Sequence, residues 1–297
     1  MTAPTVSCRA GSAAAQGPEA LLTAAAATAQ AVARDGVPDA PAAAALAAAS
    51  SLRTGVDLGT ASCVLTVLAV SGDGAQYPVW VDAHPSGALA DGVVVDFARA
   101  IAAVRRLRER AEAGLGTRLA TAATAYPPCI PVTDARACAY VCESAGFDDA
   151  VLVDEVDAAQ RTLGVHDGVV VDVGGGSTGV GVYRGGELVR LDDRPGGGHH
   201  LDLMLAGGLG IAVEDAEPYK RAHPDEAFPV LVPGLQRIAE NVRVLTAGAE
   251  DLPLHIAGGA LMIAGAETVL ARYLERTVVT YPHALLITPL GIARAAA

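Results

Sequence analysis

Two short segments of the sequence place an aspartate, glycine and hydroxyl side chains directly after an apolar run. The first segment contains Asp57, Gly59 and Thr60. The second segment contains Asp172, Gly174, Gly175, Gly176, Ser177 and Thr178. Glycine lets backbone N–H groups approach a ligand, hydroxyl groups add donors, and a carboxylate can hold a cation or its waters. Each segment therefore suits the terminal phosphates of a nucleotide with a magnesium ion, although an ordinary glycine-rich hairpin has the same local pattern.

Apolar runs on both sides of each segment indicate the strands that would position these residues. Runs 54–58 and 63–70 flank the first segment, and runs 168–173 and 179–184 flank the second. Both segments thus predict a hairpin with the order strand, aspartate, glycine, hydroxyl, strand. A repeated hairpin indicates a duplicated domain, and a cleft between the copies would receive phosphates from both sides.

The remaining pattern predicts an α/β fold with mixed sheets, because strands come first and helices follow, twice over. Further strands are expected at 76–81, 119–126, 150–153, 187–192, 254–257 and around 284–287. Helices are expected from 97 to about 114 and at 133–145, 155–163, 213–221, 228–248, 261–274 and 290–296. We expect one domain over 51–166 and a second over 167–287, with a C-terminal helix over about 288–297 as a candidate to return to the first.

A third glycine-rich stretch opens a helix in the second half of the chain. Gly197 and Gly198 precede the apolar residues of this helix. Glycines at a helix N-terminus leave backbone N–H groups and the helix dipole available to an anion, so both residues are candidates for phosphate binding.

Residues 1–50 form an alanine-rich N-terminal extension of low complexity. The stretch 19–32 has helical character, with Leu21, Leu22 and Val32 as a thin apolar stripe. So little apolar surface favours a disordered or loosely docked extension over a helix that binds a specific partner.

Composition excludes some classes of function. A net charge of −12 argues against a nucleic-acid surface, and charges or glycines interrupt every apolar run before it could span a membrane. The 5 cysteines, an odd number without a signal peptide, fit a reducing cytoplasm. Cys138 and Cys142 could share a helix face, but no further ligand stands at metal-site spacing, so we expect buried thiols.

The order of motifs resembles the actin, sugar-kinase and DnaK-type chaperone superfamily, in which two ribonuclease-H-like domains clamp ATP. The two segments look like its phosphate loops, and residues 256–259, Ile-Ala-Gly-Gly, look like its adenosine loop. Residues 154–159 resemble the connection between its domains, and residues 217–221, Glu-Pro-Tyr-Lys-Arg, resemble an adenosine-contact helix of the chaperone branch. These motifs extend over residues 54–293.

Within that superfamily the chain resembles the ethanolamine utilisation protein EutJ family. The supporting stretches read GVDLGT, DGVVVDF, AATAYPP, VLVDE, VVVDVGGGSTG, GGGHHLDLMLAG, EDAEPYKR, AGG and ITPLGIA. That family is described as a chaperone-like ATPase encoded with bacterial microcompartment genes. The resemblance implies a cytoplasmic protein, also a candidate for microcompartment association, with ATP and ADP as ligands. It further implies partners among ethanolamine-pathway enzymes or microcompartment shell proteins.

The resemblance also implies roles for single residues in a slow hydrolysis of ATP. Asp57 and Asp172 would position magnesium through waters, and Glu155 would orient the attacking water. The glycines of both loops, with Thr60, Ser177 and Thr178, would hold phosphates. The adenosine would be framed by Glu217, Lys220, Arg221, Gly258 and Gly259.

The sequence departs from the family pattern at three places. The connection reads Glu-Val-Asp at 155–157 instead of Glu-Pro-Thr, and Ala260 replaces a common serine or threonine. The chaperone branch has a lysine that stabilises phosphoryl transfer, whereas residues 87–90 contain no basic residue. ATP binding is therefore better supported than fast hydrolysis. A non-hydrolysing ATP-binding scaffold, a small-molecule kinase and an actin-like filament or pilus-assembly ATPase remain alternatives.

Overall fold

The computed structural model describes residues 17–90, 93–128 and 130–296. The first sheet has the order β3-β2-β1-β6-β7 and the second the order β10-β9-β8-β11-β12. The strands of the first sheet are β1 (Ser51–Leu58), β2 (Ser62–Val70), β3 (Gln76–Pro85), β6 (Thr121–Tyr126) and β7 (Asp149–Asp154). Those of the second are β8 (Gly168–Val173), β9 (Ser177–Arg184), β10 (Glu187–Pro195), β11 (Leu254–Ala257) and β12 (Val278–Val279). Strand β4 (Leu89–Ala90) pairs antiparallel with β5 (Val93–Val94).

The helices precede, follow or connect these strands. They are α1 (Pro18–Asp35), α2 (Ala40–Ala47), α3 (Phe97–Leu115), α4 (Val132–Ser144), α5 (Glu155–Leu163), α6 (Gly198–Leu209), α7 (Val213–Ala222), α8 (Pro224–Leu245), α9 (Ala266–Leu274), the 3₁₀ turn η1 (Ala284–Leu286) and α10 (Ile287–Ala295). The expected α/β class is confirmed.

Both sheets begin with an antiparallel meander of three strands and continue with parallel strands. The two aspartates occupy the same place in this repeat, because Asp57 pairs with Val64 and Asp172 pairs with Gly179, each seven residues further along the chain. A register shift also interrupts the pairing of β2 with β3 and of β9 with β10. The backbone thus repeats the hairpin that the sequence predicts.

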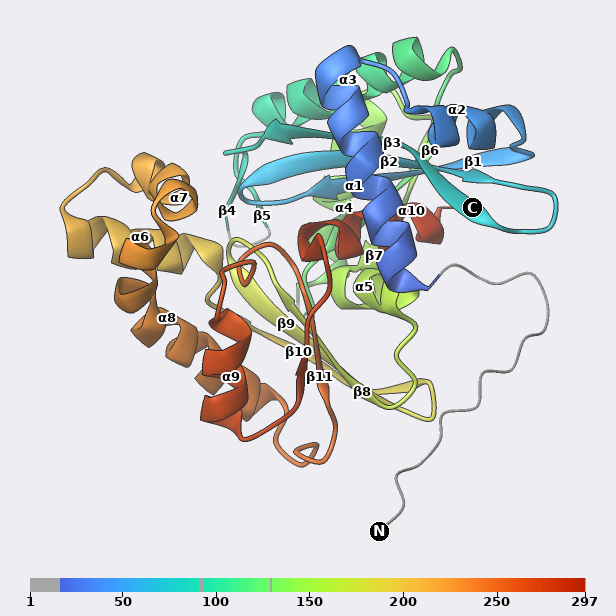
Figure 1. Ribbon diagram of the computed structural model, residues 1–297. Coiled ribbons are helices and arrows are strands. Elements are labelled where there is room, and N and C mark those ends of the chain that lie inside the picture. Colours follow the sequence, from blue (N-terminus) through green and yellow to red (C-terminus); the bar gives the residue numbers. More distant parts are fainter. Residues whose placement is uncertain (1–16, 91–92, 129, 297) are drawn as a thin grey trace.

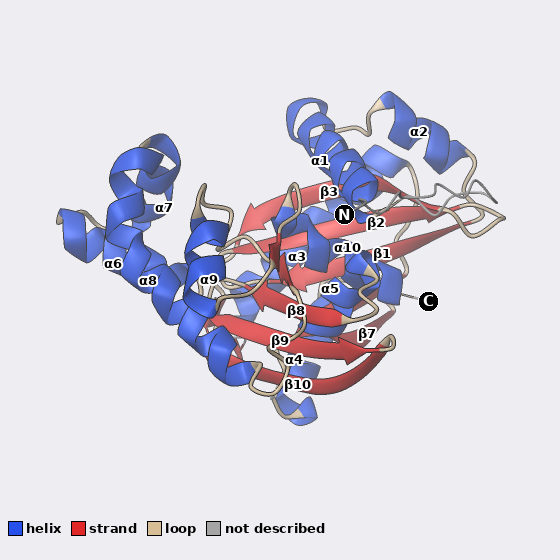
Figure 2. Ribbon diagram, turned by 60° about the horizontal axis from the view of Figure 1, so that its bottom comes forward, coloured by secondary structure: helices blue, strands red, loops and turns tan. Residues whose placement is uncertain are grey.

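The sheets are covered on their outer faces and share a layer of helices between them. Helices α3 and α4 pack on the first sheet, and α6, α8 and α9 pack against the core of the second. Between the sheets, α5 and α10 join a third apolar cluster that also includes residues of β2 and β8 (Figures 1 and 2). The red C-terminal helix of Figure 1 therefore lies beside elements from both halves of the chain.

Glycine permits α10 to lie unusually close to its neighbours. A β-carbon on Gly291 would lie 1.6 Å from the carbonyl oxygen of Ala158 in α5. A β-carbon on Gly55 in β1 would lie 2.4 Å from the backbone nitrogen of Ala293. Any larger side chain at either glycine would force the elements apart.

The structure corrects the sequence expectation for the N-terminal extension. The stretch 19–32 is not loosely docked, because α1 buries Leu21, Leu22 and Val32 completely or nearly so, and Thr28 donates a hydrogen bond to the backbone of β3. Alanines supplement the stripe, since a small side chain is enough where a helix lies flat on a sheet. The rest of the extension, residues 1–16, lies outside the described part of the chain.

The expected strand around 284–287 is also wrong, because this stretch forms η1 and the start of α10. The strand at this edge is β12, which pairs with β11. In η1, burial alternates as it does in a strand: Ala284 and Leu286 are buried and Leu285 is exposed. An apolar run this short does not distinguish the two structures. Helix α9 likewise begins later than expected, at Ala266.

Candidate nucleotide site

The two predicted phosphate loops have the same backbone hydrogen bond. The Gly59 N–H donates to the Ser62 carbonyl at 3.1 Å, and the Gly174 N–H donates to the Ser177 carbonyl at 3.1 Å. The loops also face each other, because a β-carbon on Gly175 would lie 3.2 Å from the Thr60 β-carbon. The structure therefore brings together two segments that are far apart in the sequence.

The predicted adenosine loop lies directly beside the second phosphate loop. Strand β11 runs parallel to β8, which pairs Ala257 with Asp172. Gly258 has a φ of +86°, and a β-carbon there would lie 2.6 Å from the Asp172 Oδ1 atom. Glycine is needed at this position both for the left-handed backbone and for the close approach. The contact of Gly258 and Gly259 with adenosine stays a prediction.

The glycines before α6 also contact the second loop. The Gly198 N–H donates to the Gly174 carbonyl at 2.9 Å, and the His199 N–H donates to the Gly175 carbonyl at 2.8 Å. A β-carbon on Gly197 would lie 2.3 Å from the Gly174 carbonyl oxygen. In this arrangement the helix N-terminus shapes the loop, and the Gly198 donor is already used. Direct binding of a phosphate at Gly197 and Gly198 stays a prediction.

Burial raises the pKa values of three carboxylates at this end of the strands, and the charge of Asp172 adds to the effect on the other two. Burial and the charge of Asp172 raise the pKa of Asp57 to about 7. Burial raises the pKa of Asp172 to about 6, against a hydrogen bond from Thr288 that lowers it. Burial, then Asp172 and then Asp57 raise the pKa of Glu155 well above its ordinary value. A divalent cation would relieve this repulsion, so the residues fit a magnesium ion held largely through waters and phosphate oxygens.

Glu155 owes its position to the start of α5. The neighbouring Asp154 caps this helix, with its carboxylate accepting hydrogen bonds from the N–H groups of Val156 and Asp157 at 2.8 and 3.3 Å. Burial raises the pKa of Asp154 to about 6, although these two bonds lower it. The cap fixes the backbone of the first turn of α5, from which the Glu155 side chain projects.

Thr288 is a site residue that the sequence reasoning missed. Its Oγ1 hydroxyl donates to the Asp172 Oδ2 atom at 2.6 Å, and both residues are buried. Thr288 belongs to the stretch ITPLGIA, which supported the family resemblance without receiving a role. A hydroxyl beside the final apolar run was the available signal, but the contact extends over 116 residues of sequence.

The predicted adenosine-contact helix, α7, contains a buried cation. The Lys220 Nζ atom lies 3.0 Å from the Asp202 Oδ1 atom in α6 and also pairs with Glu217. Arg221 pairs with Glu217 at 2.7 Å and is exposed. Lys220 thus ties α6 to α7. Contacts of Glu217, Lys220 and Arg221 with adenosine stay a prediction.

The remaining sequence expectations concern the cysteines, metal clusters and membrane spans. Cys138 and Cys142 are buried free thiols, as expected, whereas Cys8 and Cys129 lie outside the described residues. In the part of the chain that the structure describes, no group of three His, Cys, Asp or Glu side chains could hold a metal ion by itself. Among the described helices, none combines the length and apolar character that a membrane span requires.

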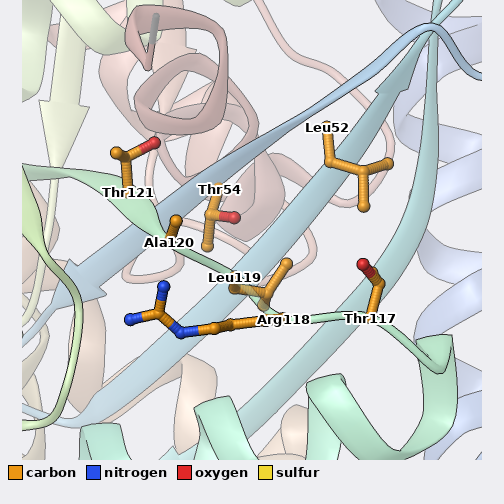
Figure 3. Close-up of a pocket in the computed structure, with 7 residues that line it drawn as sticks. All are labelled: Leu52, Thr54, Thr117, Arg118, Leu119, Ala120 and Thr121. Atoms are coloured by element: carbon orange, nitrogen blue, oxygen red, sulfur yellow. The ribbon is translucent and has the colours of Figure 1, made fainter.

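A hollow of about 270 Å³ lies at the end of the first sheet that is opposite to the two phosphate loops (Figure 3). Its lining includes Leu52 and Thr54 at the start of β1 and Thr121 at the start of β6. Asp57 is near the other end of β1. Ligands of open α/β sheets bind beyond the carboxyl ends of parallel strands, so we do not assign this hollow to the nucleotide.

Comparison with known proteins places this geometry in context. No family model matches the chain. The chain is similar to ethanolamine utilization protein EutJ of Salmonella typhimurium, with 38% identity over 240 residues that cover 80% of this chain and 84% of the relative. The crystal structure of ethanolamine utilization protein EutJ from Carboxydothermus hydrogenoformans has a TM-score of 0.81 and 36% identity, covering 94% of this chain and 99% of that chain.

More distant structures agree in fold. Crystal structures of MreB5 of Spiroplasma citri bound to ADP and to AMPPNP have TM-scores of 0.65 and 0.64 at 16% and 17% identity. They cover 82% of this chain and 95% of theirs. At this identity the likeness concerns the fold alone, and the expected actin-like fold is confirmed.

Proposed function

The chain belongs to the ethanolamine utilization protein EutJ family, and from this premise we propose that it binds Mg-ATP between two lobes and hydrolyses it slowly. Residues 51–166 with α10 would form one lobe and residues 167–287 the other. One observation carries the proposal: the two loops face each other where Thr60 meets Gly175. Both loops also have the same backbone hydrogen bond. Such loops can hold one chain of phosphates from two sides.

The carboxylates support the same proposal through their charge. Asp57 and Asp172 repel each other, which costs stability until a cation lies between the loops. Magnesium would neutralise phosphate charge when it is bound. Asp57 and Asp172 would orient its waters, and Thr60, Ser177, Thr178 and the loop N–H groups would bind phosphate oxygens. Glu155 would accept a hydrogen bond from the attacking water once the cation lowers its pKa.

The remaining predicted residues would bind the base and sugar. Adenosine would lie near Gly258 and Gly259, with Glu217, Lys220 and Arg221 on its other side. Closure of the lobes would change the surface presented to a partner, as in nucleotide-dependent switches generally. We propose a chaperone-like role in ethanolamine utilisation, with pathway enzymes or microcompartment shell proteins as partners in the cytoplasm.

The test is a thermal melt of wild type, Asp172→Ala and Asp149→Ala with and without Mg-ATP. A ligand at about 100 times its Kd adds about 2.7 kcal/mol to the free energy of unfolding, so wild type should melt at a higher temperature with nucleotide. Asp172→Ala should lose most of this increase. Asp149 is exposed at the start of β7, so the same charge change there should leave the increase intact. Equal increases in wild type and Asp172→Ala would show that the second loop is not the phosphate site.

A further inference from the structure

The segment between β3 and β4 is attached to the first phosphate loop. The Ser86 N–H donates to the Ala61 carbonyl at 3.1 Å. The Ser86 side chain is buried and accepts a hydrogen bond from the Ala88 N–H at 3.3 Å. Ala61 in turn faces the second loop, because its backbone nitrogen would lie 3.6 Å from a β-carbon on Gly175. Residues 86–88 therefore border the place where the two loops meet.

A guanidinium group lies directly on this border. A β-carbon on Gly87 would lie 2.9 Å from the Arg99 Cζ atom. Gly87 has a φ of +65°, so the backbone at this position favours glycine as well. The arginine head group fits into the space that a side chain at position 87 would occupy. The first turn of α3 delivers it there, because the Arg99 N–H is capped by the Asp96 carboxylate at 2.9 Å.

The charge of Arg99 is available for a ligand. Its side chain is exposed, and in the described ranges it forms no salt bridge. Lys220, by contrast, is already paired with two carboxylates. The charges that perturb Asp57 and Glu155 all belong to acids. Terminal phosphates add further negative charge to such a site, which makes a nearby cation valuable.

We propose that Arg99 binds the terminal phosphate of a nucleoside triphosphate between the two loops. This inference rests on the proposed function and extends it. The sequence lacks a basic residue at 87–90, but the fold brings one to Gly87 from the following helix. A planar guanidinium can donate two parallel hydrogen bonds to phosphate oxygens. At the terminal phosphate these bonds would form with a triphosphate and not with a diphosphate, which lacks that phosphate.

The experiment is calorimetric binding of Mg-AMPPNP and Mg-ADP, so that the readout does not depend on turnover. Wild type, Arg99→Ala and Arg99→Lys are compared with Arg106→Ala as the matched control. Arg106 is exposed on the same helix, seven residues later and about 10 Å further along its axis. Arg106→Ala removes the same charge without removing the group at Gly87.

Arg99→Ala should weaken Mg-AMPPNP binding about tenfold and Mg-ADP binding no more than about twofold, with Arg99→Lys between wild type and alanine. Arg106→Ala should bind both nucleotides as wild type does. Wild-type affinities in Arg99→Ala, equal losses for both nucleotides, or the same loss in Arg106→Ala would each overturn the inference while leaving nucleotide binding in place. Wild-type protein that binds neither nucleotide would overturn the proposed function and this inference with it.

Discussion

The hydrogen bond from Thr288 to Asp172 permits a prediction in which pH changes the size of a mutational effect. Valine has nearly the shape of threonine but lacks the hydroxyl, so Thr288→Val removes the 2.6 Å bond without opening a large cavity. Where Asp172 is ionised, the lost bond to a charged group costs about 1.5–3 kcal/mol of unfolding free energy. Where Asp172 is protonated, the lost neutral bond costs about 0.5–1.5 kcal/mol.

The pKa of Asp172, about 6, places this change within an accessible range of pH. We therefore expect Thr288→Val to lose about 1 kcal/mol more at about pH 8 than at about pH 4.5. Removing the hydroxyl stabilises the protonated form relative to the ionised form, so the pKa of Asp172 should rise further, by about 0.7 unit for that difference. The direction agrees with the effect of Thr288, which lowers this pKa in the wild type.

Urea unfolding of nucleotide-free protein at both pH values measures the effect. Thr288→Ser is the control, because it keeps the hydroxyl and loses only a methyl group. It should show a small loss that does not depend on pH. Equal losses for Thr288→Val at both pH values would refute the reasoning, and so would a Thr288→Ser variant with the same pH-dependent loss as the valine variant.

Further predictions follow from the same elements. Because the folded-state pKa values of Asp57 and Asp172 are raised, the unfolding free energy of nucleotide-free protein should fall as pH rises from about 4 to about 7 and then level off. Thermal melts over this range should show that Mg-ATP reduces this dependence of stability on pH. Glu155→Ala should bind Mg-ATP as wild type does but release no phosphate above background, and a time course with unchanged release would remove Glu155 from its proposed role. Gly291→Ala should lower the unfolding free energy by about 3 kcal/mol or more, because its β-carbon would overlap the Ala158 carbonyl, and this loss should exceed the roughly 1 kcal/mol that alanine gains as a helix former. Urea unfolding measures the change, with Gly207→Ala as the control because Gly207 has open space around it.

The parts of the fold that could be predicted are those that local pattern determines. The hairpins around Asp57 and Asp172 follow from an apolar run, an aspartate and glycines within a few residues, and the structure repeats them with the same register. The expectation of a strand at 284–287 is wrong because three apolar residues with alternating burial fit a strand and a 3₁₀ turn equally well. Helix α1 was underestimated, because an alanine stripe signals burial only when the surface beneath it is known.

The site was predictable only as far as its residues are close together in sequence. Thr288 reaches Asp172 because α10 returns between the sheets, and no pattern near either residue indicates that return. Arg99 reaches Gly87 because α3 begins beside β4, although residues 87–90 read as a segment without positive charge. Both contacts depend on tertiary packing, which neither periodicity nor motif spacing contains.

The close crossing of α10 and α5 lies within one of the two proposed lobes and holds its two helices together. At Gly291 the helix surface meets the Ala158 carbonyl without space for a methyl group, and the Thr162 hydroxyl donates to the Ile287 carbonyl at 2.8 Å one turn away. Tilting the two helices apart would open a void and break this bond. Sliding one helix along the other would also break it and bring a larger side chain against the Ala158 carbonyl. We therefore expect α5 and α10 to move as one unit, with their amides equally slow in hydrogen exchange with and without nucleotide. Glu155 at the start of α5 and Thr288 in the first turn of α10 would then keep a fixed separation while the cleft opens and closes.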